Sequence, residues 1–149
     1  MFLTFTNSTK KMTEDEKTRF RALADKYELK ASDFWKSPQG FVIISRRGIE
    51  KIQSGLKAEV HYYTVPEFSD IKESKYVIKA YGIIHGEEGS DGSDIRTIET
   101  FGESSPKNTK GGAQAYPVAM AEKRALSRCI LKLSDFYTLE GVYGEDEIE

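Results

Sequence analysis

Basic side chains gather in the last third of this 149-residue sequence. Between Ser104 and Lys132 there are six basic residues against one acidic residue, although the whole chain carries a formal net charge of −2. Three of the basic residues are spaced four apart, which places them in one row if the segment is helical. Guanidinium and ammonium groups in a row can neutralise phosphates and give an affinity that depends on salt. The residues that we predict for such a site are Arg46, Arg47, Lys107, Lys110, Lys123, Arg124, Arg128 and Lys132.

The same row of charges is also typical of a solvated helix face, and charge alone does not separate the two interpretations. Four tyrosines in the expected strands could add base stacking to a phosphate site, because stacking on aromatic rings is a common way to hold single-stranded nucleic acid. Core packing is the more common role for each of them taken separately. These tyrosines are Tyr62, Tyr63, Tyr76 and Tyr81.

Motifs for catalysis or metal binding are not recognisable. His61, His85 and Cys129 do not have the spacing of a zinc site. The segment SDGSD at 90–94 lacks the ligand series and the closing glutamate of a calcium loop. We find no phosphate-binding loop, nucleophile elbow or dinucleotide fingerprint. We therefore expect a protein that is not an enzyme and that uses no metal and no cofactor.

Composition and cysteine content limit the class of protein. Hydrophobic residues make up 38% and charged residues 31% of the chain, which is ordinary for a soluble globular protein and excludes wholesale disorder and membrane spanning. The apolar run near the N-terminus is too short for a secretory signal. The one cysteine, Cys129, cannot form an internal disulfide. We expect a cytoplasmic protein without a membrane partner.

Local patterns predict the elements that must position the basic residues. Thr13 and Glu16 can form a capping box before an apolar periodicity, which predicts a helix over 14–28. Residues 41–45 are typical of a short buried strand, and 49–55 of a short helix. Strands rich in β-branched and aromatic residues are expected at 57–65, 75–84 and 95–102. Their connections are too short for crossover helices, so we predict an antiparallel meander.

A long exposed loop at 103–115 leads into the last predicted helix, which has Pro117 near its first turn. An apolar stripe on this helix is expected to face the sheet and to leave the basic row on another face. The stripe consists of Val118, Ala121, Ala125, Leu126, Cys129, Ile130 and Leu133.

Together these elements predict an α+β fold. It consists of a three-stranded antiparallel meander with a long C-terminal helix packed across it, plus a short strand–helix entry unit and an N-terminal helix. We expect a single domain over 1–149, with a flexible N-terminus at 1–12, a globular core at 13–139 and an acidic C-terminal tail at 140–149. Four of the last five residues are acidic, and without them the formal net charge changes from −2 to +2. Such a terminal run is usually solvated.

The order of these parts resembles the single-strand annealing proteins of the Rad-fifty-two superfamily, including their phage and mobile-element relatives. GFVIISRRGIEKI at 40–52 resembles the entry strand and helix of that family, and IETFGESSPKNTKGG at 98–112 resembles its third strand and lysine-bearing loop. AYPVAMAEKRALSRCILKL at 115–133 is similar to the family's long helix, with a pattern close to A-x-x-x-A-L-x-R. GVYGEDE at 141–147 lies where the family has an acidic stretch containing tyrosine.

The resemblance implies a function without catalysis. Members of the family form rings or helical filaments that hold single-stranded DNA in a basic groove, with the bases outward, and promote pairing with a complementary strand. The arginine that opens the family's short helix corresponds to Arg47, and the arginine in its long helix corresponds to Arg128. Two other basic family positions fall on Ser127 and near Leu131, which are departures that Lys132 or Arg124 could offset.

These observations lead to a leading hypothesis and two alternatives. The first is a homo-oligomeric protein that binds and anneals single-stranded DNA in recombination or repair, with other recombination proteins as partners. The alternatives are a plain single-stranded DNA-binding protein without annealing activity, and a protein-interaction module whose basic helix docks an acidic partner. On the first hypothesis, Arg47→Ala and Arg128→Ala should each weaken DNA binding and leave thermal stability nearly unchanged.

Overall fold

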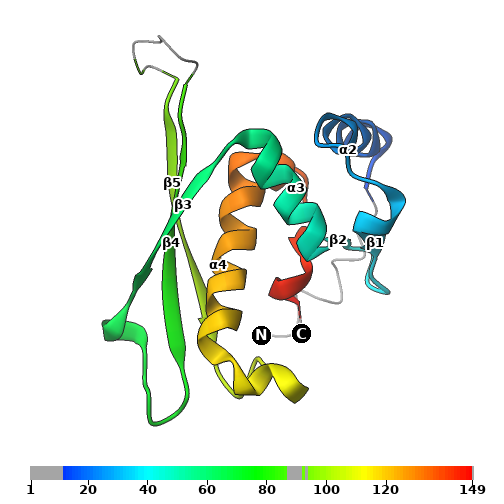
Figure 1. Cartoon of the computed structure of the whole chain (residues 1–149). Helices are drawn as coiled ribbons and strands as arrows, with labels where there is room; N and C mark the ends of the chain where they lie inside the picture. The colour runs from blue at the N-terminus through cyan, green and yellow to red at the C-terminus, as the bar shows by residue number, and fades with distance from the viewer. Residues whose placement is uncertain (1–11, 87–91, 93, 149) are drawn as a thin grey trace.

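The computed structural model describes residues 12–86, 92 and 94–148, and this part of the chain has three α-helices and two three-stranded sheets (Figure 1). The helices are α2 (Glu14–Lys26), α3 (Arg46–Leu56) and α4 (Pro117–Leu133). One sheet contains β1 (Phe34–Lys36), β2 (Val42–Ile44) and β6 (Val142–Gly144). The other contains β3 (Glu59–Thr64), β4 (Tyr76–Ile84) and β5 (Arg96–Ser104). Apart from Met12, the N-terminus that we predict to be flexible lies outside the described residues, as does most of the loop between β4 and β5.

The sheet of β3, β4 and β5 confirms the predicted meander. Both of its strand pairs are antiparallel, with Tyr62 opposite Ala80 in the first pair and Ala80 opposite Thr100 in the second. The helix α4 lies along one face of this sheet (Figure 1). The predicted α+β fold, with a long C-terminal helix packed across a meander, is therefore confirmed.

Small residues allow α4 to approach the sheet closely. Ala121 and Ala125 on the helix are fully buried. A Cβ atom added at Gly102 of β5 would overlap the backbone oxygen of Ala121 and the backbone nitrogen of Ala125. A Cβ atom added at Gly82 of β4 would overlap Sγ of Cys129. The distance between helix and sheet is thus set by positions where only glycine fits.

The second sheet includes two strands that the sequence patterns do not predict, β1 and β6. Strand β1 pairs with β2 in an antiparallel manner, and β6 pairs with β2 in a parallel manner, with Val142 opposite Val42. Val142, Gly144 and Asp146 are buried. The folded core therefore extends to the acidic residues near the C-terminus instead of ending at residue 139, and the prediction of a solvated tail over 140–149 is corrected for its described part, residues 140–148.

The helix α4 is buried on two sides because it lies between two apolar clusters. One cluster combines α4 with the sheet of β3, β4 and β5, and includes Ala80, Ala125 and Cys129. The other joins residues of α2, α3, the small sheet and the far side of α4, and includes Ile52 and Ile130. Figure 1 shows α4 between the long sheet on the left and α3 with β2 on the right.

The two N-terminal helices begin at capping residues. Thr13 and Glu16 form the predicted capping box, with the Glu16 amide donating to Oγ1 of Thr13 at 3.1 Å. Ser45 caps α3 by accepting from the amide of Gly48 at 3.0 Å. The helix α3 therefore begins at Arg46, earlier than predicted, and Arg46 and Arg47 lie in its first turn.

Candidate nucleic-acid interface

The basic row on α4 is not uniformly exposed. Arg124 is 4% exposed, whereas the side chain of Arg128 is 42% exposed and Lys132 is exposed. Arg124 shares a helix face with Ser127 and Leu131, three and seven residues further on, and both of these are buried too. This face of α4 is covered by the C-terminal segment and by the loop after β5.

Arg124 holds backbone segments together. Its Nε donates to the carbonyl oxygen of Asp146 at 2.8 Å, its Nη1 to that of Glu103 at 2.9 Å and its Nη2 to that of Asn108 at 2.6 Å. The planar fork of a guanidinium suits such a contact to several oxygens at once. Arg124 is therefore a structural residue, and its predicted role as a phosphate contact is corrected, because its donors are already used inside the fold.

Arg46 and Arg128 each bind a carboxylate of the C-terminal acidic turn, Glu145–Glu147. Nη2 of Arg46 lies 2.9 Å from Oδ1 of Asp146, and its Nε lies 3.4 Å from Oδ2. This hydrogen bond raises the pKa of Arg46. Nε of Arg128 lies 3.0 Å from Oε1 of Glu147, and its Nη1 donates to the carbonyl oxygen of Phe101 on β5 at 2.6 Å. Arg46 and Arg128 therefore converge with Arg124 on one acidic turn.

Glu147 lies in a partly desolvated position. Burial raises the pKa of its carboxyl group, although a hydrogen bond from the amide of Gly144 at 2.8 Å and the charge of Arg128 act in the opposite direction. Oε1 of Glu147 binds Arg128, while Oε2 accepts from Gly144. The carboxylate is thus held by one cation and one backbone amide.

Arg47 faces a different group of residues from those that surround Arg128. It lines a hollow of about 520 Å³ together with Asp33, Arg46, Glu50 and Glu145. Burial opposes the ionisation of Asp33, but the amide of Lys30 and the ammonium group of Lys51 outweigh it, so that the pKa of Asp33 lies below its ordinary value. Arg46 binds the same acidic turn as the arginines of α4. Arg47, the next residue of α3, lines the neighbouring hollow.

The four predicted lysines differ from the paired arginines in forming no ion pair within the described part of the chain. Lys107, Lys110 and Lys132 are exposed and Lys123 is half-buried. None of the four forms an ion pair with another residue that the structure describes. Lys107 and Lys110 belong to the same loop as Asn108, which is bound by Arg124.

A hollow in the described part of the chain lies next to Arg128. It has a volume of about 820 Å³ and brings Arg128 and Lys132 together with three aromatic rings. Nζ of Lys132 lies 5.2 Å from the centre of the Tyr137 ring, and the rings of Phe41 and Tyr143 meet edge to face at 5.3 Å. Sequence reasoning did not select these aromatics. The only signal for Tyr143 was the tyrosine in the stretch GVYGEDE.

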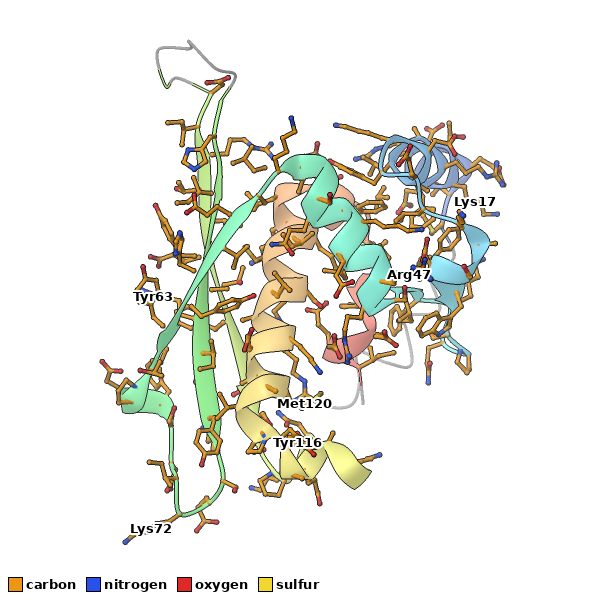
Figure 2. The ribbon with its side chains drawn as sticks, in the orientation of Figure 1. Lys17, Arg47, Tyr63, Lys72, Tyr116 and Met120 are labelled. Atoms are coloured by element: carbon orange, nitrogen blue, oxygen red, sulfur yellow. The ribbon has the colours of Figure 1, made fainter. Side chains whose placement is uncertain are left out.

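The four tyrosines selected from the sequence are divided between the two faces of the meander. Tyr62 and Tyr76 are on the same face as Ala80, which packs on α4, whereas Tyr63 and Tyr81 are on the opposite face. Figure 2 shows Tyr63 directed away from α4. Burial raises the pKa of Tyr62 to about 12. These tyrosines therefore do not form one stacking surface beside the arginines.

The described residues contain no group of three or more histidine, cysteine, aspartate and glutamate side chains that could hold a metal ion. His61 and His85 both hydrogen-bond to Glu59, at 2.8 and 2.9 Å. Burial raises the pKa of the Cys129 thiol to about 11, which keeps it protonated near neutral pH. None of the helices described has the length and apolar character that a membrane span requires.

A comparison of the chain with protein-family models, curated proteins and solved structures gives no match. The resemblance to the Rad-fifty-two superfamily therefore stays a prediction that depends on the residues of 40–147.

Proposed function

We propose that this protein binds single-stranded DNA without catalysis and promotes the annealing of complementary strands in recombination or repair. The observation that carries the proposal is the convergence of Arg46 and Arg128 on one surface region, with Lys132 lining the hollow beside Arg128 and with Lys107 and Lys110 in the loop that Arg124 binds. Guanidinium groups bind phosphate and carboxylate oxygens with the same geometry. A region that offers this many cations can follow a sugar-phosphate backbone.

Annealing agrees with a site made mainly of cations. A protein that grips the backbone leaves the pairing edges of the bases free to find partners. Each phosphate contact is weak, so a useful affinity needs many subunits on one strand. We therefore propose a homo-oligomer, as a ring or filament, that acts in the cytoplasm with other recombination proteins as partners. A plain single-stranded DNA-binding protein would use the same surface and would not speed up pairing.

One observation favours a second candidate, a module that docks an acidic protein. Arg46 and Arg128 already bind carboxylates within this chain, and an acidic peptide could offer the same groups. This candidate predicts little affinity for an oligonucleotide even at low salt. Binding of labelled oligo(dT) at low salt therefore separates it from the DNA-binding proposals.

Charge removal at the loop lysines tests the proposal. We expect the double variant Lys107→Gln/Lys110→Gln to weaken binding of oligo(dT) and to reduce the slope of log K against log salt by about 1.4, at about 0.7 for each phosphate that a lysine no longer neutralises. The matched control is Lys17→Gln/Lys72→Gln, which removes the same charge from α2 and from the turn before β4, both away from α4 (Figure 2). Equal slopes for the two double variants would refute the predicted interface.

Annealing itself needs a separate measurement. Two complementary oligonucleotides, one with a donor and one with an acceptor fluorophore, report pairing as energy transfer. We expect the protein to accelerate pairing and the Lys107→Gln/Lys110→Gln variant to accelerate it less. Binding without acceleration would identify a plain single-stranded DNA-binding protein. Electron microscopy with and without a long oligonucleotide would detect the expected rings or filaments.

A further inference from the structure

The acidic turn Glu145–Glu147 lies where the proposed function needs phosphates. Asp146 contacts Arg46 through two donors, and Glu147 contacts Arg128 through Nε. The backbone oxygen of Asp146 also accepts from Arg124. Three arginines that the sequence groups as one basic site are thus bound by two consecutive acidic residues of the same chain, two of them through carboxylates and Arg124 through a backbone oxygen.

The two sides of these ion pairs differ in exposure. The side chains of Arg46 and Arg128 are 49% and 42% exposed, whereas those of Asp146 and Glu147 are 7% and 10% exposed. A phosphate arriving from solvent can therefore reach the guanidinium groups while the carboxylates stay inside. The guanidinium side of each pair is therefore open to a second anion, although a carboxylate that loses its cation stays buried without a partner.

The acidic turn cannot drift away from the arginines as a loose tail could. It directly follows β6, which is paired with β2 inside the sheet. Tethering of this kind gives the carboxylates a high effective concentration at the arginines. Any anion from solution must compete with them at every encounter.

We propose that the acidic turn is an internal competitor of DNA, whose carboxylates occupy the phosphate positions at Arg46 and Arg128 and so limit the affinity of the protein for single strands. This inference depends on the proposed function. It adds regulation of the same site, because a change that withdraws the carboxylates opens the arginines. The three acidic residues of the turn contribute −3 to the formal net charge of −2, so the rest of the chain has a formal net charge of +1.

Glu147→Gln tests the competitor directly. The glutamine keeps an oxygen for the Gly144 amide and removes the charge that faces Arg128. We expect this variant to bind fluorescein-labelled oligo(dT) about fivefold more tightly than the unaltered chain between roughly 50 and 200 mM NaCl, which is the gain from freeing one partly exposed ion pair. Fluorescence anisotropy measures the affinity, and thermal melting shows that the variant is folded.

The control is Glu122→Gln, which removes one negative charge from an exposed position of α4 that forms no ion pair with the described residues. If Glu147→Gln fails to fold, Glu145→Gln is the second variant: its carboxylate accepts from the backbone amide of Arg46 at 2.6 Å, and its negative charge also acts on the Arg46 guanidinium. Tighter binding by the acidic-turn variant, with Glu122→Gln close to the unaltered chain, supports the competitor. Equal or weaker binding by the acidic-turn variant, or the same gain in the control, overturns it and leaves the proposed function intact. If no protein binds oligo(dT) at the lowest salt, the proposed function fails and the competitor fails with it.

Discussion

Arg124 and Arg128 are one helical turn apart on α4, and they differ in what they can bind. Arg124 donates to three backbone carbonyl groups from separate segments and is 4% exposed. Arg128 donates to one carbonyl group and one carboxylate and keeps 42% of its side chain exposed. The difference arises because the loop after β5 and the C-terminal segment cover the turn of the helix that carries Arg124.

We expect Arg124→Ala to lower the free energy of unfolding by about 2–4 kcal/mol, since several buried carbonyl groups would lose their donor. Chemical denaturation followed by circular dichroism measures the change. The control is Arg47→Ala, which removes an exposed arginine and should change stability by less than about 0.5 kcal/mol. A stable Arg124→Ala protein would mean that water replaces the guanidinium and that Arg124 is not structural.

The structure changes the stability that we expect for Arg128→Ala. The sequence alone predicts nearly unchanged thermal stability for this variant. In the structure Arg128 donates to Phe101 and pairs with Glu147, so its removal leaves a partly buried carboxylate without its cation. Loss of DNA binding by Arg128→Ala is therefore informative only together with its unfolding curve, whereas Arg47→Ala has no such complication.

At the scale of elements, the contact of α4 with the meander depends on small residues in register. Ala121 and Ala125 on α4 face Gly102 on β5. Arg124 and Arg128 then reach the carbonyl groups of Glu103 and Phe101 on β5, which is an edge strand. The close approach and the arginine contacts are linked, because a helix further from the sheet could not place its guanidinium groups at this strand.

We expect Gly102→Ala to cost about 3 kcal/mol of stability, because its Cβ would overlap backbone atoms of α4, which cannot rotate away as a side chain can. The matched control is Gly112→Ala, where an added Cβ meets nothing within 4 Å and the expected change is within about 0.5 kcal/mol. Thermal and denaturant unfolding of both variants measures the difference. Equal stability of the two would show that α4 can shift on the sheet without loss.

Elements with strong local signals could be predicted from the sequence. The capping box of α2, the three strands of the meander and the long α4 each have a pattern within their own residues. Strands β1 and β6 have three residues each, which is too short for a recognisable alternation, and β6 pairs with a strand a hundred positions earlier in the chain. Helix periodicity did indicate that Arg124 could be buried, because Ser127 and Leu131, which are not charged, share its face of the helix.

At the scale of the whole molecule, the C-terminal segment joins the two halves of the fold. Strand β6 completes the small sheet, and the acidic turn after it is bound by α3 through Arg46 and by α4 through Arg124 and Arg128. The candidate site could be predicted from the sequence only as a set of cations. The carboxylates that pair with these cations were not predictable, because the pairing depends on where the C-terminal acidic residues fold. From the sequence, those residues are predicted to be a solvated tail.

We expect a chain that ends at Glu140 to lose at least about 4 kcal/mol of stability, because it lacks the buried Val142 and the partners of Arg46, Arg124 and Arg128. The free energy of unfolding of a typical domain is about 5–15 kcal/mol. The shortened chain should therefore unfold at a much lower urea concentration than the full chain or be unfolded without urea. A chain that ends at Glu147 is the control and should unfold like the full chain, since it keeps β6 and the acidic turn. Urea titration followed by circular dichroism compares the three. If the chain ending at Glu140 is as stable as the full chain and binds oligo(dT) more tightly, the segment is a dispensable tail after all, and the joining role of β6 is wrong.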